Sequence, residues 1–143
     1  MNIKTEARKR LMQFGIKPSL HRLAVMEYLM GNLTHPTTDT IYNNLFPAIP
    51  TLSKTTVYNI LKLFEEKRAI AAIVIDGKNA RYDSDISQHA HFQCRKCGSV
   101  RDLRLKETLP VMVENSDNLV IDDCHIYFRG YCSECGKNYI SMN

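Results

Sequence analysis

Apolar residues in the first half of the chain recur at the spacing of amphipathic helices. The pattern predicts helices over residues 4–14, 18–30, 37–46 and 53–67, and a glycine or proline follows each of the first three. Thr37 and Ser53 are typical caps for the last two of them. The fourth segment carries the clearest apolar stripe, which consists of Val57, Ile60, Leu61 and Phe64. We therefore expect a helical first half whose core is built from such stripes.

Two short apolar segments after the fourth helix predict a hairpin. Residues 71–75 and 80–83 are typical of strands, and the Asp-Gly pair within residues 76–79 is typical of a tight turn. Short helices followed by a two-stranded ribbon predict a winged helix-turn-helix domain, with segment 53–67 in the major groove of DNA. We assign residues 1–83 to this domain, residues 84–88 to a polar hinge, and residues 89–143 to a second domain.

Charge supports a nucleic-acid partner for the first domain. Residues 1–83 carry 12 Lys and Arg against 7 Asp and Glu, whereas residues 84–143 carry 7 against 8. A basic half suits binding to a polyanion, although it is also compatible with an ordinary helical domain that has a solvated outer face. Polar residues near the start of segment 53–67 are expected to reach base edges and phosphates. These are Lys54, Thr55, Thr56, Tyr58 and Asn59.

The second half of the chain has the alternation of β-strands. Strands are predicted over residues 89–94, 98–105 and 119–132, with a helix over residues 107–115 that packs across the small sheet. The predicted fold class is therefore α+β, with a winged helix-turn-helix domain followed by a small α/β domain.

Two CxxCG elements in this half predict a structural zinc site. A two-residue spacer lets both thiolates of each pair reach one metal, and four thiolates in a tetrahedron select zinc. The alternative interpretations are redox dithiols and cysteines that simply fill space, and an odd number of cysteines argues against a disulfide framework. The ligands are Cys94, Cys97, Cys132 and Cys135. The fifth, Cys124, is expected to be a small buried hydrophobe on the last strand.

A second metal site is predicted around the first CxxC element. If this element is the turn of a hairpin, His89 lies opposite Asp102 and His91 lies opposite Val100, so that His89, His91 and Asp102 share one face. Asp83 and His35 are the candidates to complete the set from the first domain. Five nitrogen and oxygen ligands suit Fe(II), Mn(II) or zinc.

Other classes of protein fit less well. No apolar run approaches the roughly 20 residues of a membrane span, so we expect a cytoplasmic protein without a membrane partner. A zinc hydrolase or deaminase needs an open zinc position and an H-x-E motif followed by P-C-x-x-C, which the sequence lacks. A zinc module that binds only proteins is the remaining alternative, and the basic first half argues against it.

The sequence resembles the ferric uptake regulator family over nearly its whole length. The similar segments are residues 15–22, 35–42, 53–59 and 89–91 and both CxxC elements. This resemblance implies a metal-dependent transcriptional repressor rather than an enzyme. It also implies a C-terminal dimerisation domain, a regulatory metal between the domains, and a homodimer that binds palindromic double-stranded operators.

Within the family, the sequence is most similar to the peroxide-responsive branch. That branch uses three histidines and two aspartates for its regulatory Fe(II) or Mn(II), which implies His35, Asp83, His89, His91 and Asp102 here. The resemblance implies that peroxide oxidises His35 or His89 when Fe(II) is bound. An iron- or zinc-responsive uptake regulator is the alternative. Iron-sensing relatives commonly have glutamate in place of Asp83 and Asp102, and Gln88 and Ala90 depart from the pattern of a further metal site.

Overall fold

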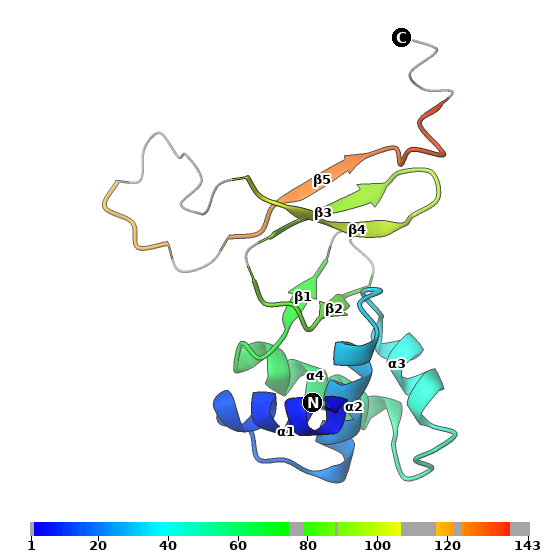
Figure 1. Ribbon diagram of the computed structural model, residues 1–143, viewed down its shortest axis with the longest axis vertical. Coiled ribbons are helices and arrows are strands. Elements are labelled where there is room, and N and C mark those ends of the chain that lie inside the picture. Colours follow the sequence, from blue (N-terminus) through cyan, green and yellow to red (C-terminus); the bar gives the residue numbers. More distant parts are fainter. Residues whose placement is uncertain (1, 75–78, 88, 107–116, 122–123, 138–143) are drawn as a thin grey trace. The chain divides into compact units, whose positions relative to one another are not determined.

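The computed structural model describes residues 2–74, 79–87, 89–106, 117–121 and 124–137. The chain forms two compact units, Met1–Ile86 and Ser87–Asn143, drawn in Figure 1. The division follows Ile86, which lies in the polar segment 84–88. Within the described ranges, no helix combines the length and the apolar character needed to cross a bilayer.

The first unit contains the four helices that the apolar pattern predicts. They are α1 (Ile3–Gln13), α2 (Leu20–Gly31), α3 (Thr38–Leu45) and α4 (Lys54–Glu66). Ser19, Thr37 and Ser53 cap the last three, because each side-chain oxygen accepts the N–H three residues later. The caps predicted at Thr37 and Ser53 are therefore confirmed, and they fix where α3 and α4 begin.

The core of the first unit is the set of apolar stripes on these helices. All four residues of the α4 stripe are buried, and they belong to one cluster with Leu11, Val25, Leu29 and Ile41 from the other helices. Burial of each large side chain contributes on the order of 2 kcal/mol to folding. The opposite side of α4 is thereby left exposed to solvent.

A short hairpin follows α4. Strands β1 (Ala71–Ile73) and β2 (Arg81–Asp83) pair antiparallel, with Ala72 opposite Tyr82, and both are shorter than predicted. Most of the predicted turn at 76–79 lies outside the described residues. A further bridge joins Thr37 to Arg81, and the Tyr82 N–H donates to the Pro36 carbonyl at 3.0 Å. Strand β2 is therefore tied to the segment that leads into α3.

The second unit contains a three-stranded sheet in the order β4-β3-β5. Its strands are β3 (His89–Cys94), β4 (Val100–Arg104) and β5 (Tyr127–Gly130), and β3 pairs antiparallel with β4 and parallel with β5. Figure 1 shows β3 in the centre.

The predicted register of the β3–β4 hairpin is wrong by two residues. His91, not His89, lies opposite Asp102, and His89 lies opposite Arg104. The turn is longer than predicted, because Gly98 adopts a φ of 75° and the Cys94 N–H donates to the Ser99 carbonyl. A shift by two residues preserves the face on which each side chain lies.

The predictions for the end of the chain need two corrections. The last strand covers only Tyr127–Gly130 rather than residues 119–132, since the pairing with β3 extends over four residues. Cys124 precedes this strand and is exposed, so its predicted role as a buried hydrophobe is wrong. The helix predicted over residues 107–115 lies outside the described residues.

Candidate functional site

The four cysteines of the two CxxC elements come together in the second unit. Their sulfur atoms all lie within 4.8 Å of one another, and the sulfurs of Cys97 and Cys132 are 3.9 Å apart. Four sulfurs at 2.3 Å from a central zinc would be separated by about 3.8 Å, as a regular tetrahedron requires. The cluster therefore fits a tetrahedral zinc ion.

Each CxxC element is a tight turn with the same internal hydrogen bond. The N–H of Cys97 points to the sulfur of Cys94, and the N–H of Cys135 points to the sulfur of Cys132, both at 3.5 Å. The glycine after the second pair is required, because a Cβ at Gly136 would lie 2.9 Å from the Cys132 carbonyl oxygen. At the first pair, Gly98 has a φ of 75°, a backbone conformation that favours glycine.

The pKa values of the cluster's thiols are shifted in opposite directions. Hydrogen bonds from the backbone of Cys132 and Cys97 lower the pKa of Cys94 to about 6, and the Ser99 hydroxyl lowers the pKa of Cys97. The neighbouring sulfur of Cys132 raises the pKa of Cys135 to about 12. Shifts in opposite directions are expected when several sulfurs lie close together, because the first thiolates to form disfavour ionisation of the remaining thiols. A divalent cation at the centre would offset this repulsion between thiolates.

A second group of metal-binding side chains lies on β3 and β4. The Oδ1 atom of Asp102 is 3.3 Å from Nε2 of His89 and 3.2 Å from Nε2 of His91. Ligand atoms about 2.1 Å from one metal at right angles are separated by roughly 3 Å, so these atoms fit a shared ion. We call His89, His91 and Asp102 the strand ligand set.

A backbone contact orients His89 within this set. Its Nδ1 lies 2.7 Å from the Ser87 carbonyl oxygen, which accepts a hydrogen bond from the Nδ1–H in one tautomer. In that tautomer Nε2 is the nitrogen that carries the lone pair and faces Asp102. Hydrogen bonds of this type commonly orient histidines that bind metals.

The first unit holds a separate pair of candidate ligands, His35 and Asp83, which we call the helix-unit ligand set. Nε2 of His35 lies 3.5 Å from Oδ2 of Asp83, and each residue is only 3% exposed. His35 has a φ of 56°, a left-handed conformation that costs on the order of 1 kcal/mol for a residue with a Cβ. The fold therefore holds an ionisable pair buried and one member of it in an unfavourable conformation.

Neighbouring contacts fix the backbone on both sides of the helix-unit ligand set. The guanidinium of Arg10 donates to the carbonyls of Ala69 and Ser84 at 3.1 and 2.8 Å, and the buried Ser84 hydroxyl donates to the Leu29 carbonyl. These bonds tie the residue after Asp83 to α1 and α2. The segment is thus anchored before the chain enters the second unit.

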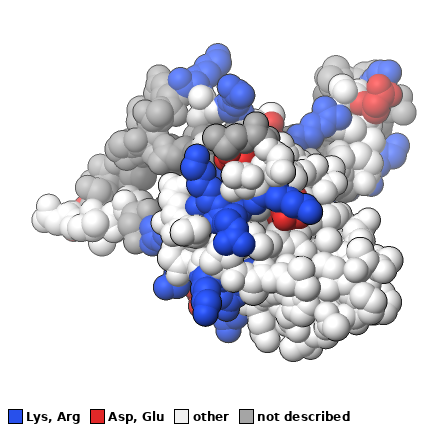
Figure 2. All heavy atoms as spheres, turned by 60° about the horizontal axis from the view of Figure 1, so that its bottom comes forward, with Lys and Arg blue, Asp and Glu red and all other residues white. Residues whose placement is uncertain are grey.

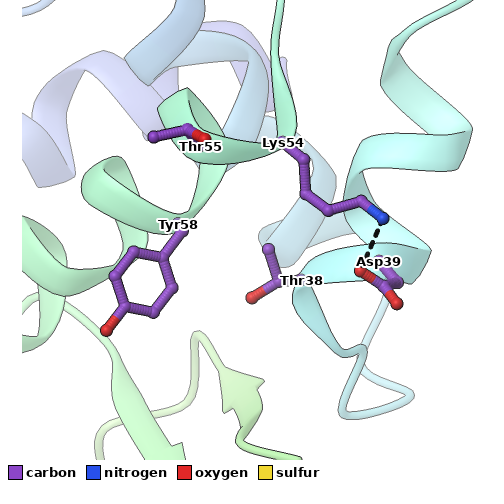
Figure 3. A pocket seen from close by; sticks show the side chains of 5 residues that line it. All are labelled: Thr38, Asp39, Lys54, Thr55 and Tyr58. Atoms are coloured by element: carbon purple, nitrogen blue, oxygen red, sulfur yellow. Dashed lines mark ion pairs between the residues drawn. The ribbon is translucent and has the colours of Figure 1, made fainter.

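The exposed side of α4 presents the residues predicted to bind DNA. Lys54, Thr55 and Tyr58 line an open hollow of about 360 Å³ together with Thr38 and Asp39 of α3, as Figure 3 shows. Asn59 is exposed beside them. We call Lys54, Thr55, Tyr58 and Asn59 the α4 surface.

Thr56, also predicted to contact DNA, does not belong to the α4 surface. It is partly buried, and its hydroxyl lies 2.8 Å from that of Ser53 in the helix cap. Sequence reasoning also missed Thr38 and Asp39, because a hollow between two helices depends on how the helices pack. On the face drawn in Figure 2, Lys and Arg predominate among the charged side chains.

Comparison with known proteins identifies a family and a similar regulator. Residues 13–129 match the Ferric uptake regulator family. The peroxide operon regulator of Bacillus subtilis (strain 168) is 29% identical over 134 residues, covering 92% of this chain and 92% of that protein.

Two solved structures show the likeness of the fold. The Helicobacter pylori ferric uptake regulator, described as having three functional metal binding sites, matches with a TM-score of 0.70 and 22% identity, covering 94% of this chain and 92% of that one. PerR from Streptococcus pyogenes, described in terms of peroxide sensing and gene regulation, matches with a TM-score of 0.52 and 24% identity, covering 94% of each chain. The predicted fold class is thus confirmed.

Proposed function

Because the chain belongs to the Ferric uptake regulator family, it is a metal-responsive transcription regulator, and we propose that it is a peroxide-sensing repressor. Members of this family are regulators of transcription, bind DNA and form dimers. In our proposal, a homodimer binds a palindromic operator in the cytoplasm when its regulatory metal is present. The structural metal is zinc on the four-cysteine cluster.

The observation that carries the proposal is the chemistry of the two ligand sets. Together they offer three imidazoles and two carboxylates, a donor set suited to Fe(II) or Mn(II) and distinct from the four thiolates. Each set is incomplete alone, with two and three ligands. We propose that one regulatory ion takes ligands from both sets and thereby fixes the orientation of the two units that binds DNA.

The peroxide response is the finer part of the proposal. Fe(II) held by the two ligand sets would supply one electron to hydrogen peroxide as the O–O bond breaks, and the histidine ring that gains the oxygen atom would supply the second electron. His35 and His89 are the residues that we propose to take up oxygen, as the resemblance to the peroxide-responsive branch implies. The similarity to the Bacillus subtilis peroxide operon regulator supports this function over that of a metal-uptake regulator.

Replacement of His91 by alanine should abolish activation by metal without unfolding the protein. His91 is a buried ligand of the strand set, and its loss should weaken binding of the regulatory metal by about 100-fold or more. A metal gives activation only through its preference for the active orientation, so DNA binding should no longer respond to Mn(II). Calorimetric Mn(II) titration and operator binding with and without Mn(II) measure both effects.

The exposed His125 provides the matched control for this experiment. It lies outside both ligand sets, although its ring stacks on Tyr127 with centroids 6.1 Å apart. His125→Ala should retain metal activation. If His91→Ala binds Mn(II) and DNA as the wild type does, the strand ligand set is not the regulatory site.

For the α4 surface, we expect Tyr58→Ala to weaken operator binding by about 10-fold. Tyr58 is 52% exposed and lines the hollow between α3 and α4, so removal of its ring takes away contact area without disturbing the core. Tyr58→Phe keeps the ring and should separate the contribution of the hydroxyl. Fluorescence anisotropy with labelled operator measures affinity, and zinc and manganese contents should be unchanged. Normal affinity of the alanine variant would assign DNA recognition to another element.

A further inference from the structure

The contact between α3 and α4 suggests a role for an acidic residue on the surface that meets DNA. We propose that Asp39 is a specificity-determining residue that, by pairing with Lys54, reduces the affinity of the regulator for DNA of arbitrary sequence. This inference rests on the DNA-binding function proposed above. The residues of the α4 surface are proposed to make DNA binding strong, whereas Asp39 is proposed to make it selective.

The geometry places the head of Lys54 on α3. Lys54 is the first residue of α4, and its ammonium lies 3.2 Å from Oδ1 of Asp39, the second residue of α3. The same ammonium lies 5.8 Å from the ring centroid of Tyr42, within the range of a cation–π interaction. Figure 3 shows Lys54 extending across the hollow to Asp39.

The pair contributes little to folding. The side chains of Lys54 and Asp39 are 57% and 68% exposed, and ion pairs so exposed stabilise proteins by at most about 1 kcal/mol. A lysine in the first turn of a helix is also unfavourable with respect to the helix dipole. What the pair does change is the electrostatic character of the α4 surface.

Attraction of lysine to phosphates is independent of base sequence and dominates nonspecific binding. A carboxylate paired with Lys54 cancels much of that attraction. Selectivity is a difference of affinities, so a group that penalises complexes held by phosphates alone raises it.

In a complex with the operator, Thr55, Tyr58 and Asn59 add contacts to base edges. In that complex the ion pair holds the Lys54 side chain in one position. Loss of the pair would free the positive charge of Lys54 for phosphates but would also lose this fixed position, so the two effects on operator affinity oppose each other. Removal of the carboxylate should therefore strengthen nonspecific binding more than operator binding.

The test compares wild type and Asp39→Asn on two DNA duplexes. One is selected by the Mn(II)-loaded wild-type protein from a random pool, and the other has the same composition in scrambled order. For the variant, we expect affinity for the scrambled duplex to rise about fivefold to tenfold and its logarithmic salt slope to steepen by about one. Affinity for the selected duplex should stay within about twofold of the wild-type value.

Three further variants identify the cause. Glu66→Gln makes the same charge change at the far end of α4 and should leave both affinities unchanged. Asp39→Glu keeps the charge and should behave as the wild type. In a Lys54→Ala background, Asp39→Asn should have no effect on the scrambled duplex if Asp39 acts through Lys54.

Several results would overturn the inference. These are equal tightening on both duplexes, unchanged affinity for the scrambled duplex, an effect that persists in the Lys54→Ala background, or the same effect from Glu66→Gln. Loss of selected binding alone would instead make Asp39 a direct contact to bases. If the wild-type protein selects no duplex, the DNA-binding proposal itself fails; the outcomes above leave that proposal standing.

Discussion

Replacement of Cys97 by serine should cause loss of zinc, unfolding of the second unit and loss of the dimer. The serine hydroxyl is a poor zinc ligand, and the three remaining sulfurs cannot complete the tetrahedron that the cluster fits. Binding of zinc to such sites supplies on the order of 10 kcal/mol of folding free energy, which exceeds the stability of most small domains. Zinc content, circular dichroism and size-exclusion chromatography measure the three losses.

The reason for expecting so large an effect is the small size of the structure around the cluster. Cys94 ends β3 and Cys132 follows β5 by two residues, so the metal joins the C-terminal ends of two parallel strands in a sheet of three short strands. Without zinc, the crowded thiols also lose the cation that balances their ionisation. Removal of zinc from the wild type with a strong chelator should therefore have the same effect.

Cys124 provides the matched control for this prediction. It is exposed and lies outside the cluster, so Cys124→Ser should keep zinc, fold and dimer. A Cys97→Ser protein that is folded and dimeric without zinc would show that the cluster has no structural role.

The features that the sequence predicts best depend on local interactions. Ser53 caps α4 through a bond to the residue three positions later, and Cys94 and Cys97 approach each other across one turn. Helical periodicity is likewise set within one element. The helices, their caps and the four-cysteine cluster could therefore be predicted without knowledge of the tertiary structure.

The features that the sequence does not reveal depend on geometry beyond one element. The β3–β4 register required the length of the turn at Gly98, and the end of the last strand depended on how far β3 could pair with it. The Asp39–Lys54 pair depends on how α3 packs beside α4. The prediction that His89, His91 and Asp102 share a face survived because the register error was an even number of residues.

The Fe(II)-loaded wild type should lose its operator on exposure to hydrogen peroxide, whereas the Mn(II)-loaded protein should retain it. We expect the loss to coincide with the addition of one oxygen atom to His35 or His89. Anaerobic loading, anisotropy across a peroxide series and mass spectrometry of the peptides that contain these histidines make the measurement. The Mn(II)-loaded protein is the internal control, because it has the same ligands without iron.

Asp102→Glu should retain DNA binding with Fe(II) but need about 10-fold more peroxide to release it, a direction that follows from geometry. Oδ1 of Asp102 lies 3.2 and 3.3 Å from the two Nε2 atoms of the strand ligand set. Glutamate keeps the charge but adds a methylene, which displaces the carboxylate by roughly 1.5 Å. Asp117→Glu makes the same change at an exposed residue outside every cluster of possible metal ligands in the described part of the chain and should leave the response unchanged.

Operator binding after exposure to peroxide, taken together with the mass spectrometry, distinguishes the two candidate functions within the family. A metal-uptake regulator requires only that the metal bind reversibly, so its DNA affinity should follow metal concentration and be indifferent to peroxide at equal occupancy. A peroxide sensor also requires that a ligand be changed irreversibly, so restoring fresh Fe(II) after the exposure should fail to recover DNA binding. If the wild type shows no added oxygen on either histidine and regains its operator with fresh metal, the peroxide proposal is wrong. The two ligand sets would then serve an iron- or zinc-responsive uptake regulator.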